Sequence, residues 1–264
     1  MATLGTGQLT AIDVNPSEYI AIAAEQGLDT VSLFINPMGS LSGDCITTRQ
    51  TSAAIKEQLR ATGIQVANVE CFPIVPGLDV ESYRSALELG AELGAKSATV
   101  IIYDPDTASV IDSLSKLCDI TAELGMAVGI EFMPLAVGWK TLPETVELVK
   151  QVAKPNLGIG VDLLHLIRSG GTPEDVAATD PAYIAYAQLC DSVNLDATED
   201  YVEEASAHRL APGDGNFPMQ AFLQALPAGT PLELEVPQKS DVPARERLKT
   251  IVAATRRQLE QAGL

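Results

Sequence analysis

The chain repeats one unit along its length: a short apolar run, a turn, an amphipathic stretch, and then the next apolar run. Seven of these runs are clear, and a weaker one at the start makes eight. In chain order they read "LGTGQLTAID", "TVSLFI", "IQVANVE", "SATVIIYD", "MAVGIEF", "NLGIGVD", "AYAQLCD" and "PLELEVP". β-rich runs that alternate with helical stretches predict parallel strands joined by crossover helices.

Signals for the ends of helices support this division. Glycines at 27, 63, 94 and 125 end helical stretches just before the next run. Asn15 and Thr141 each stand three residues before a glutamate with a proline between, which is typical of a helix start, and Thr172 begins a similar segment. Residues 241–263 are expected to form a closing helix, whereas residues 191–215 show no periodicity and are expected to form an extended loop.

Eight such units in 264 residues favour a closed (β/α)₈ barrel. An open doubly wound sheet has fewer strands as a rule and carries a glycine-rich phosphate loop after its first strand, and no GxGxxG pattern stands there. No low-complexity linker or break in composition divides the chain. We therefore expect residues 1–264 to form a single α/β barrel domain.

Composition excludes several classes of function. The formal charge of −18 disfavours a nucleic-acid partner, and no apolar stretch approaches the length of a membrane span. The first residues lack the pattern of a secretory signal, so we expect a cytoplasmic protein. Four widely spaced cysteines form no zinc-binding spacing and are expected to be free thiols. A small-molecule substrate is the expected partner, and a homo-oligomer stays open.

Acidic residues stand at or near the end of six runs: Glu70, Asp104, Glu131, Asp162, Asp191 and Glu235. The carboxyl ends of barrel strands carry the chemistry in this architecture, and alternate side chains point into the barrel. Glu131 shares its face with Gly129, and Asp162 with Gly160, so small residues are expected beneath each carboxylate. Asp104 and Asp191 are interpreted as turn and loop anchors.

Carboxylates that converge on one end of a barrel repel each other unless they share protons or hold a cation. The same alternation turns Gln188 inward, together with Glu235 and Glu233, which share one face of their strand. A divalent ion held by Glu131, Asp162, Gln188 and Glu235 is the simplest resolution. These oxygen ligands suit Mg²⁺ or Mn²⁺, and Co²⁺ would also fit.

Five motifs in this order and spacing, "GIEFMP", "GVDLLHLIRSGGTPED", "QLCD", "HRLAPGDG" and "LELEVP", resemble the xylose-isomerase-like barrel family of sugar isomerases and epimerases. The resemblance implies metal ligands at Glu131, Asp162, Gln188 and Glu235. Gln188 departs from the family, which has a histidine there. The resemblance also implies that Glu131 and Glu235 carry a proton between adjacent carbons of a ketose through an enediolate that the metal stabilises.

Further roles follow from the same resemblance. His165 stands where the family has a residue that contacts substrate oxygens or orients a ligand, and Arg209 where an arginine polarises a substrate hydroxyl. Glu70 is expected to close the pocket wall. Each of these residues also has a structural interpretation: His165 as a cap of the turn after the sixth strand, Arg209 as a brace of the acidic loop, and Glu70 as part of an ion pair at the rim.

The leading hypothesis is a metal-dependent isomerase or epimerase of a small ketose or related carbonyl compound. A lyase of the same superfamily, a dehydratase acting on 3-dehydroshikimate or on a keto-inositol, is the alternative. The first of these usually has a histidine where this chain has Met133. A superfamily endonuclease would need several more histidines and a basic face. A barrel that binds a metabolite without turnover stays open as a third class.

Overall fold

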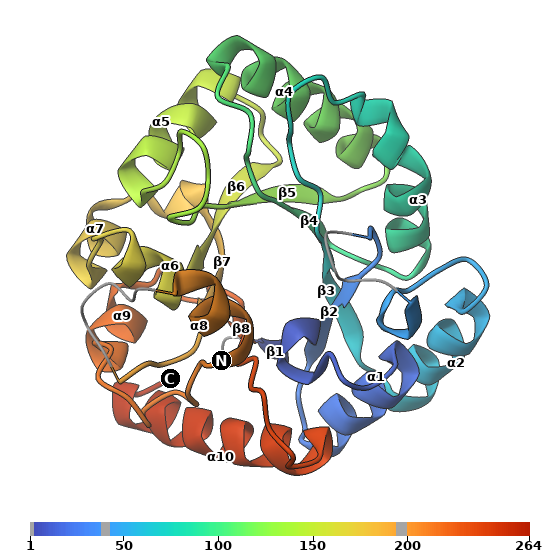
Figure 1. The fold of residues 1–264 in the computed structure, drawn as a ribbon, viewed down its shortest axis with the longest axis vertical. Coiled ribbons are helices and arrows are strands. Elements are labelled where there is room, and N and C mark those ends of the chain that lie inside the picture. Colours follow the sequence, from blue (N-terminus) through green and yellow to red (C-terminus); the bar gives the residue numbers. More distant parts are fainter. Residues whose placement is uncertain (1–2, 38–42, 194–199) are drawn as a thin grey trace.

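A computed structural model describes residues 3–37, 43–193 and 200–264. Eight parallel strands close into a barrel in chain order, with β8 paired to β1 (Figure 1). The strands are β1 (Leu4–Thr6), β2 (Thr30–Phe34), β3 (Gln65–Glu70), β4 (Ser97–Val100), β5 (Ala127–Glu131), β6 (Leu157–Asp162), β7 (Ile184–Leu189) and β8 (Leu232–Leu234). This arrangement confirms the predicted (β/α)₈ barrel.

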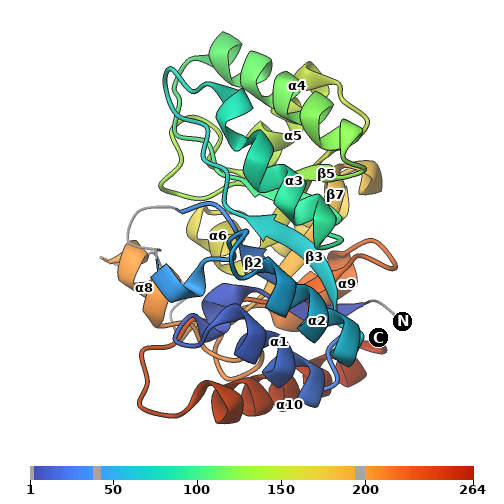
Figure 2. The ribbon, with the colours of Figure 1, turned by 90° about the vertical axis from the view of Figure 1, so that its right-hand side faces the viewer.

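Helices cover the outside of the barrel, and the two views in Figures 1 and 2 show α1 lying beside α10, where the ring closes. The α-helices are α1 (Pro16–Glu25), α2 (Ser52–Thr62), α3 (Arg84–Glu92), α4 (Thr107–Glu123), α5 (Leu142–Val152), α6 (Leu163–Arg168), α7 (Pro173–Ala178), α8 (Tyr201–Ala207), α9 (Met219–Ala225) and α10 (Ala244–Ala262). Short 3₁₀ helices are η1 (Gln8–Ala11), η2 (Gly43–Cys45), η3 (Val80–Tyr83) and η4 (Pro181–Tyr183). In the described ranges no helix has both the length and the apolar character needed to cross a membrane.

Local chemistry sets the ends of these helices as predicted. The Asn15 side chain accepts a hydrogen bond from the backbone N–H of Glu18 and caps α1. Thr141 and Glu144 form a reciprocal capping box at the start of α5. Gly63 ends α2 with a φ of 77°, a left-handed conformation that glycine adopts without steric cost.

The expectation of an extended loop over residues 191–215 is wrong in part, because α8 lies within it; residues 194–199 fall outside the described ranges. Asp200 caps this helix by accepting from Glu203 N–H, and Glu204 is ion-paired to the buried Arg168 of α6. A seven-residue helix held by tertiary polar contacts needs no apolar periodicity. The sequence pattern therefore could not show it.

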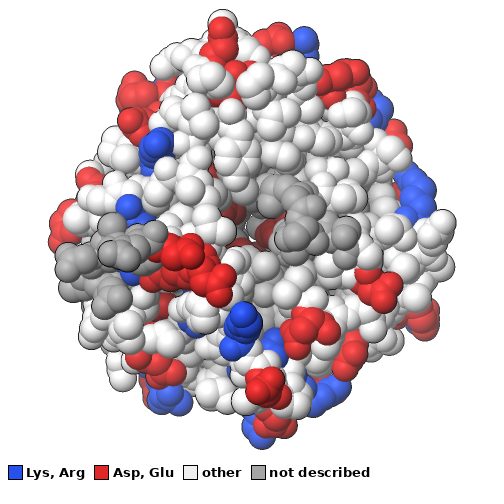
Figure 3. Space-filling view, in the orientation of Figure 1, with Lys and Arg blue, Asp and Glu red and all other residues white. Residues whose placement is uncertain are grey.

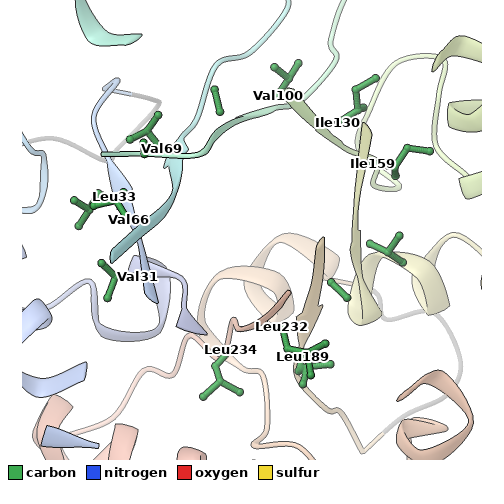
Figure 4. Packing of buried hydrophobic residues seen from close by; sticks show 14 of the residues in the cluster. Val31, Leu33, Val66, Val69, Val100, Ile130, Ile159, Leu189, Leu232 and Leu234 are labelled. Atoms are coloured by element: carbon green, nitrogen blue, oxygen red, sulfur yellow. The ribbon is translucent and has the colours of Figure 1, made fainter. Parts of the chain in front are cut away.

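Alternation along the strands separates a hydrophobic layer from the barrel interior. Val31, Leu33, Ile130, Ile159 and Leu234 are buried beneath the helices, pointing away from the barrel axis (Figure 4). The opposite face of each strand is left to small and polar residues. This places the main hydrophobic core between the strands and the helices and leaves the barrel interior to polar chemistry.

One aromatic ring explains two of the inward-facing glycines, Gly129 and Gly160. Tyr186 of β7 lies level with Gly160 of β6, and a β-carbon on Gly129 of β5 would lie 2.6 Å from Tyr186 Cε1. A β-carbon on Gly160 would meet the same ring. Tyr186 OH is 3.0 Å from Thr99 Oγ1 of β4, so the ring spans the barrel and its hydroxyl is satisfied. The two glycines leave room for the Tyr186 ring, which lies beneath the residues of the candidate site.

Candidate active site

The predicted site residues converge on the carboxyl end of the barrel. Glu131 ends β5, Asp162 ends β6, Gln188 lies in β7, Glu70 ends β3, and Glu235 follows β8 directly. A cavity of about 180 Å³ opens there. Figure 3 looks onto this face and shows a hollow near its centre with acidic atoms inside. Five of the seven predicted residues line the cavity: Glu70, Glu131, His165, Arg209 and Glu235.

A chain of hydrogen bonds crosses one side of the cavity. His165 Nε2 is 2.9 Å from Glu131 Oε1, and His165 Nδ1 is 2.7 Å from the hydroxyl of Tyr201 on α8. Burial raises the pKa of Tyr201 well above its ordinary value, so the hydroxyl keeps its proton. From the carboxylate beside Nε2 we infer that a neutral His165 donates from Nε2 to Glu131 and accepts from Tyr201 at Nδ1. His165 therefore orients one carboxylate of the site.

A buried arginine joins the other two carboxylates. Arg209 Nη1 lies 2.6 Å from Asp162 Oδ2 and 2.9 Å from Glu235 Oε2, and its Nε donates to the carbonyl of Ala205 in α8. The second oxygen of Asp162 accepts from the backbone N–H of His165 and caps α6. Both oxygens of Asp162 are thus engaged. Arg209 braces α8, and it also reaches the cavity.

Gln188 occupies a lower layer of the barrel. Its Cα lies level with Glu233, not with Glu235, in the pairing of β7 and β8. Both amide atoms of Gln188 are fully buried and have no hydrogen-bond partner of good geometry among the described residues. Glu233 accepts a hydrogen bond from Ser32 and does not line the cavity. The choice between Glu233 and Glu235 thus falls on Glu235, which faces the cavity.

The carboxyl groups of the site differ in acidity because their surroundings differ. Burial raises the pKa of Asp162, but the charge of Arg209 and the contacts with His165 outweigh burial, and the pKa falls to about 2. Burial and the nearby Glu131 and Asp162 raise the pKa of Glu235 well above its ordinary value, although Arg209 opposes this. Burial and the charges of Glu233 and Glu131 likewise raise the pKa of Glu70. The site thus combines Asp162, which is ionised at neutral pH, with Glu235 and Glu70, whose raised pKa values favour the protonated form.

The donor set fits a divalent cation. Glu131, His165 and Glu235 each have an atom that could bind a metal, and these atoms lie within 4.8 Å of one another in a buried site. His165 would bind only by giving up its hydrogen bond to Glu131. Gln188 lies level with Glu233 and does not line the cavity, so its assignment as a ligand stays a prediction. Carboxylate, amide and imidazole donors suit Mn²⁺, Mg²⁺ or Co²⁺. For Asp162 to act as a ligand, Arg209 would have to release one of its oxygens, so that assignment stays a prediction.

Sequence reasoning missed Tyr201 and the Arg168–Glu204 pair that holds its helix. Arg168 Nε and Nη2 donate to the two oxygens of Glu204 at 2.7 and 2.6 Å, and Nη2 also donates to Ser192 Oγ. Tyr201 stands in an acidic segment without periodicity, so no local pattern marks it. Its role depends on contacts with α6, which the sequence does not show.

Comparisons with known proteins agree with this architecture. The sequence profile of the family described as xylose isomerase-like TIM barrel matches residues 20–258. A 3-dehydroshikimate dehydratase of Pseudomonas aeruginosa is 26% identical over 236 residues, which are 84% of this chain and 36% of that protein. The chain thus spans about a third of the length of that relative.

Solved structures share the fold at low identity. The zinc-containing structure of the IOLI protein superposes with a TM-score of 0.84 at 18% identity, covering 98% of this chain and 99% of the other. A D-allulose 3-epimerase from Methylomonas sp. superposes with a TM-score of 0.73 at 17% identity, covering 99% and 98%. The family profile spans most of the barrel and the residues that form the candidate site. This chain belongs to the xylose isomerase-like TIM barrel family.

Proposed function

We propose that this chain is a divalent-metal-dependent isomerase or epimerase of a small ketose or related carbonyl compound. The observation that carries the proposal is the placement of Glu131, at the end of β5, and Glu235, just after β8, on one buried cavity. Two carboxyl groups that face a substrate from different directions can remove a proton from one carbon and return one at another position or face. The family contains isomerases, epimerases and dehydratases, and it supports this class of chemistry.

The reaction begins when one glutamate carboxylate takes the proton from the carbon next to the carbonyl. The electrons of the C–H bond move into the adjacent C–C bond, those of the carbonyl move to oxygen, and an enediolate results. Return of a proton at the neighbouring carbon gives an isomer, and return on the other face gives an epimer. A bound divalent cation would lower the energy of the negative charge on the substrate oxygens.

The remaining residues have roles in this scheme. Glu131, Glu235 and Gln188 would hold the cation, with Asp162 as a fourth ligand once Arg209 moves from it. His165 donates to Glu131 and fixes which of its oxygens faces the substrate. Arg209, beside Glu235, would donate to a substrate hydroxyl and hold it in position. Glu70, with its raised pKa, would present a neutral carboxyl as part of the wall.

The test is exchange of substrate C–H for deuterium. The Mn²⁺-loaded protein is incubated in D₂O with a panel of free ketoses, and loss of the signal of the proton next to the carbonyl is followed by NMR. We expect Glu131→Gln and Glu235→Gln to lower the exchange rate by about 10²–10⁴-fold, the range of one general acid or base. The matched control is Glu147→Gln, on the exposed surface of α5. Exchange that survives both substitutions would overturn the proposal.

A dehydratase is the second candidate, because the curated relatives that match most of this chain are 3-dehydroshikimate dehydratases. Its first step is the same proton removal, but the hydroxyl on the next carbon then leaves as water. The two reactions separate in one experiment. An isomerase incorporates deuterium and conserves substrate mass apart from that label, whereas a dehydratase yields a product lighter by one water, detected by mass spectrometry.

A further inference from the structure

Glu233 is a buried carboxyl group to which neither the resemblance nor the proposed function gives a role. It lies in β8, is 4% exposed and does not line the cavity. Ser32 of β2 donates a hydrogen bond to its Oε2. Its Oε1 is fully buried and has no hydrogen-bond partner among the described residues. An unpartnered carboxylate oxygen inside a protein is costly, so we expect a donor to face it.

Gln188 is the neighbour that has an unused donor. In the pairing of the strands it lies level with Glu233 of β8 on one side and with Asp162 of β6 on the other. It is fully buried, and neither its Nε2 nor its Oε1 has a partner of good geometry in the described part of the chain. Two adjacent strands thus carry an unpartnered donor and an unpartnered acceptor at paired positions.

The acidity of Glu233 shows that the two side chains are close. Burial raises the pKa of Glu233 to about 7, and the side chains of Ser32, Gln188 and Asn68 oppose this rise. Gln188 therefore lies near the carboxyl group, although its amide is not aligned for a hydrogen bond. The last torsion angle of a glutamine has a broad energy minimum, so the amide can turn toward Oε1 at little cost.

The two carboxylates beside Gln188 differ in what they can still accept. One oxygen of Asp162 accepts from the backbone N–H of His165 and the other from Arg209, whereas Oε1 of Glu233 is open. The NH₂ group of Gln188 therefore has its open acceptor on the β8 side. Since the nitrogen and oxygen of an amide point in different directions, this contact turns the oxygen toward β6. The reverse orientation would set two oxygen atoms against each other.

We propose that Glu233 is a positioning residue of the cation site: its Oε1 accepts a hydrogen bond from Gln188 Nε2 and so turns the Gln188 carbonyl oxygen toward Asp162 and the cation. Glu233 itself does not touch the cation. The inference rests on the cation of the proposed function, and it assigns a role to a residue outside the cavity. A glutamine binds a hard cation through its oxygen alone, so Glu233 holds Gln188 in the orientation that a ligand needs.

A double-mutant cycle on Mn²⁺ binding tests the proposal. Calorimetry on the full chain compares the wild type, Glu233→Met, Gln188→Met and the double variant, because methionine keeps the length of both side chains and removes their hydrogen-bonding groups. We expect Glu233→Met to weaken Mn²⁺ binding about 10–100-fold, the range typical of a group that orients a metal ligand. In the Gln188→Met background the same substitution should lose most of its effect, because the residue through which it acts is gone.

Two results of the cycle would overturn the proposal. Binding of Mn²⁺ to Glu233→Met as tight as to the wild type would show that Gln188 needs no orienting partner. An equal loss in both backgrounds would show that Glu233 acts through its charge and not through Gln188. The control for net charge is Glu147→Gln, which removes a carboxylate from the surface of α5 and should bind Mn²⁺ as the wild type does.

Nuclear magnetic resonance detects the hydrogen bond without altering Glu233, so the test stays decisive if Glu233→Met does not fold. The side-chain amide protons of Gln188 are assigned through bonds in the wild type loaded with Mg²⁺, which is diamagnetic. We expect one of the two protons well downfield of the other glutamine amide protons, since it is donated to a carboxylate. Ordinary shifts for both protons overturn the proposal.

These measurements separate the inference from the proposed function. If the cycle and the amide shift agree with expectation but no ketose exchanges deuterium, Glu233 positions Gln188 and the proton-transfer function fails. If exchange depends on Glu131 and Glu235 but Glu233→Met binds Mn²⁺ as the wild type does, the function stands and the positioning role fails. A wild type that binds no Mn²⁺ overturns both.

Discussion

At the scale of single residues, the candidate site depends on which groups hold protons. Tyr201 donates to His165 Nδ1, and His165 then donates to Glu131, so a residue outside every sequence motif fixes the tautomer of a residue inside one. His165 was expected to contact the substrate or orient a ligand, and the structure shows it bound to Glu131. From its two hydrogen bonds we infer protonation at Nε2, and the sequence could not show those contacts.

Replacing Tyr201 with phenylalanine tests this chain. Tyr201→Phe removes the donor to Nδ1 and releases the tautomer of His165, so we expect the exchange rate to fall about 10–100-fold, the cost typical of an orienting partner in a metal site. The ¹⁵N shifts of the His165 ring should move toward a mixture of tautomers. Tyr103→Phe is the control, because Tyr103 also lines the cavity but is not bonded to His165. Unchanged ring shifts in Tyr201→Phe would show that the hydroxyl does not set the tautomer.

At the scale of the elements, the strands and helices place these groups through packing that is visible only in three dimensions. Glycines beneath Glu131 and Asp162 could be predicted to face inward from the alternation of the strands. The ring that requires them, Tyr186, lies on the next strand, and the pairing of β6 with β7 shifts register between Ile159 and Gly160. A shift of register has no signature in a single sequence.

The contact with Tyr186 predicts the cost of adding one methyl group. Gly160→Ala should lower the free energy of unfolding by about 1–3 kcal/mol, because the new β-carbon meets the Tyr186 ring in a packed interior. In a Tyr186→Leu background the same substitution should cost less, and urea unfolding of the four proteins measures the coupling. Additive effects would show that the two positions do not interact.

Helix α8 depends on a buried ion pair. Burial alone would raise the pKa of Glu204, but hydrogen bonds from Arg168 and Ser192 outweigh it and the pKa is lowered. The ion pair therefore stabilises the fold above the ordinary glutamate pKa of about 4.3, and this stabilisation is lost as the pH falls through the lower native value.

Glu204→Gln tests the role of this pair in stability. At pH 7 it should lower the free energy of unfolding by about 2–4 kcal/mol, since it leaves Arg168 buried without its counter-charge. The difference from the wild type should shrink as the pH falls below about 4, as measured by chemical denaturation at each pH. Glu203→Gln is the control on the exposed side of the same helix. A difference that is constant with pH would show that ionised Glu204 is not the source.

At the scale of the whole molecule, the sequence was sufficient to predict the architecture and the place of the candidate site. Eight alternating units favoured a barrel, and acidic residues at strand ends predicted a common edge, where Glu131 and Glu235 lie close together. The sequence could not show how the polar side chains of the candidate site are paired or protonated. The ion pairs of Arg209, the layer of Gln188 and the helix that carries Tyr201 all arise from contacts between distant segments.

The central claim is that Glu131 and Glu235 hold one divalent cation at the mouth of the barrel. Native mass spectrometry of the purified chain equilibrated with Mn²⁺ measures this directly, with Glu131→Gln, Glu235→Gln and the surface variant Glu147→Gln alongside. The account predicts one Mn²⁺ per chain in the wild type and the surface variant, and at least tenfold weaker binding in both site variants. A wild-type chain that binds no Mn²⁺, or site variants that bind it equally well, would contradict it.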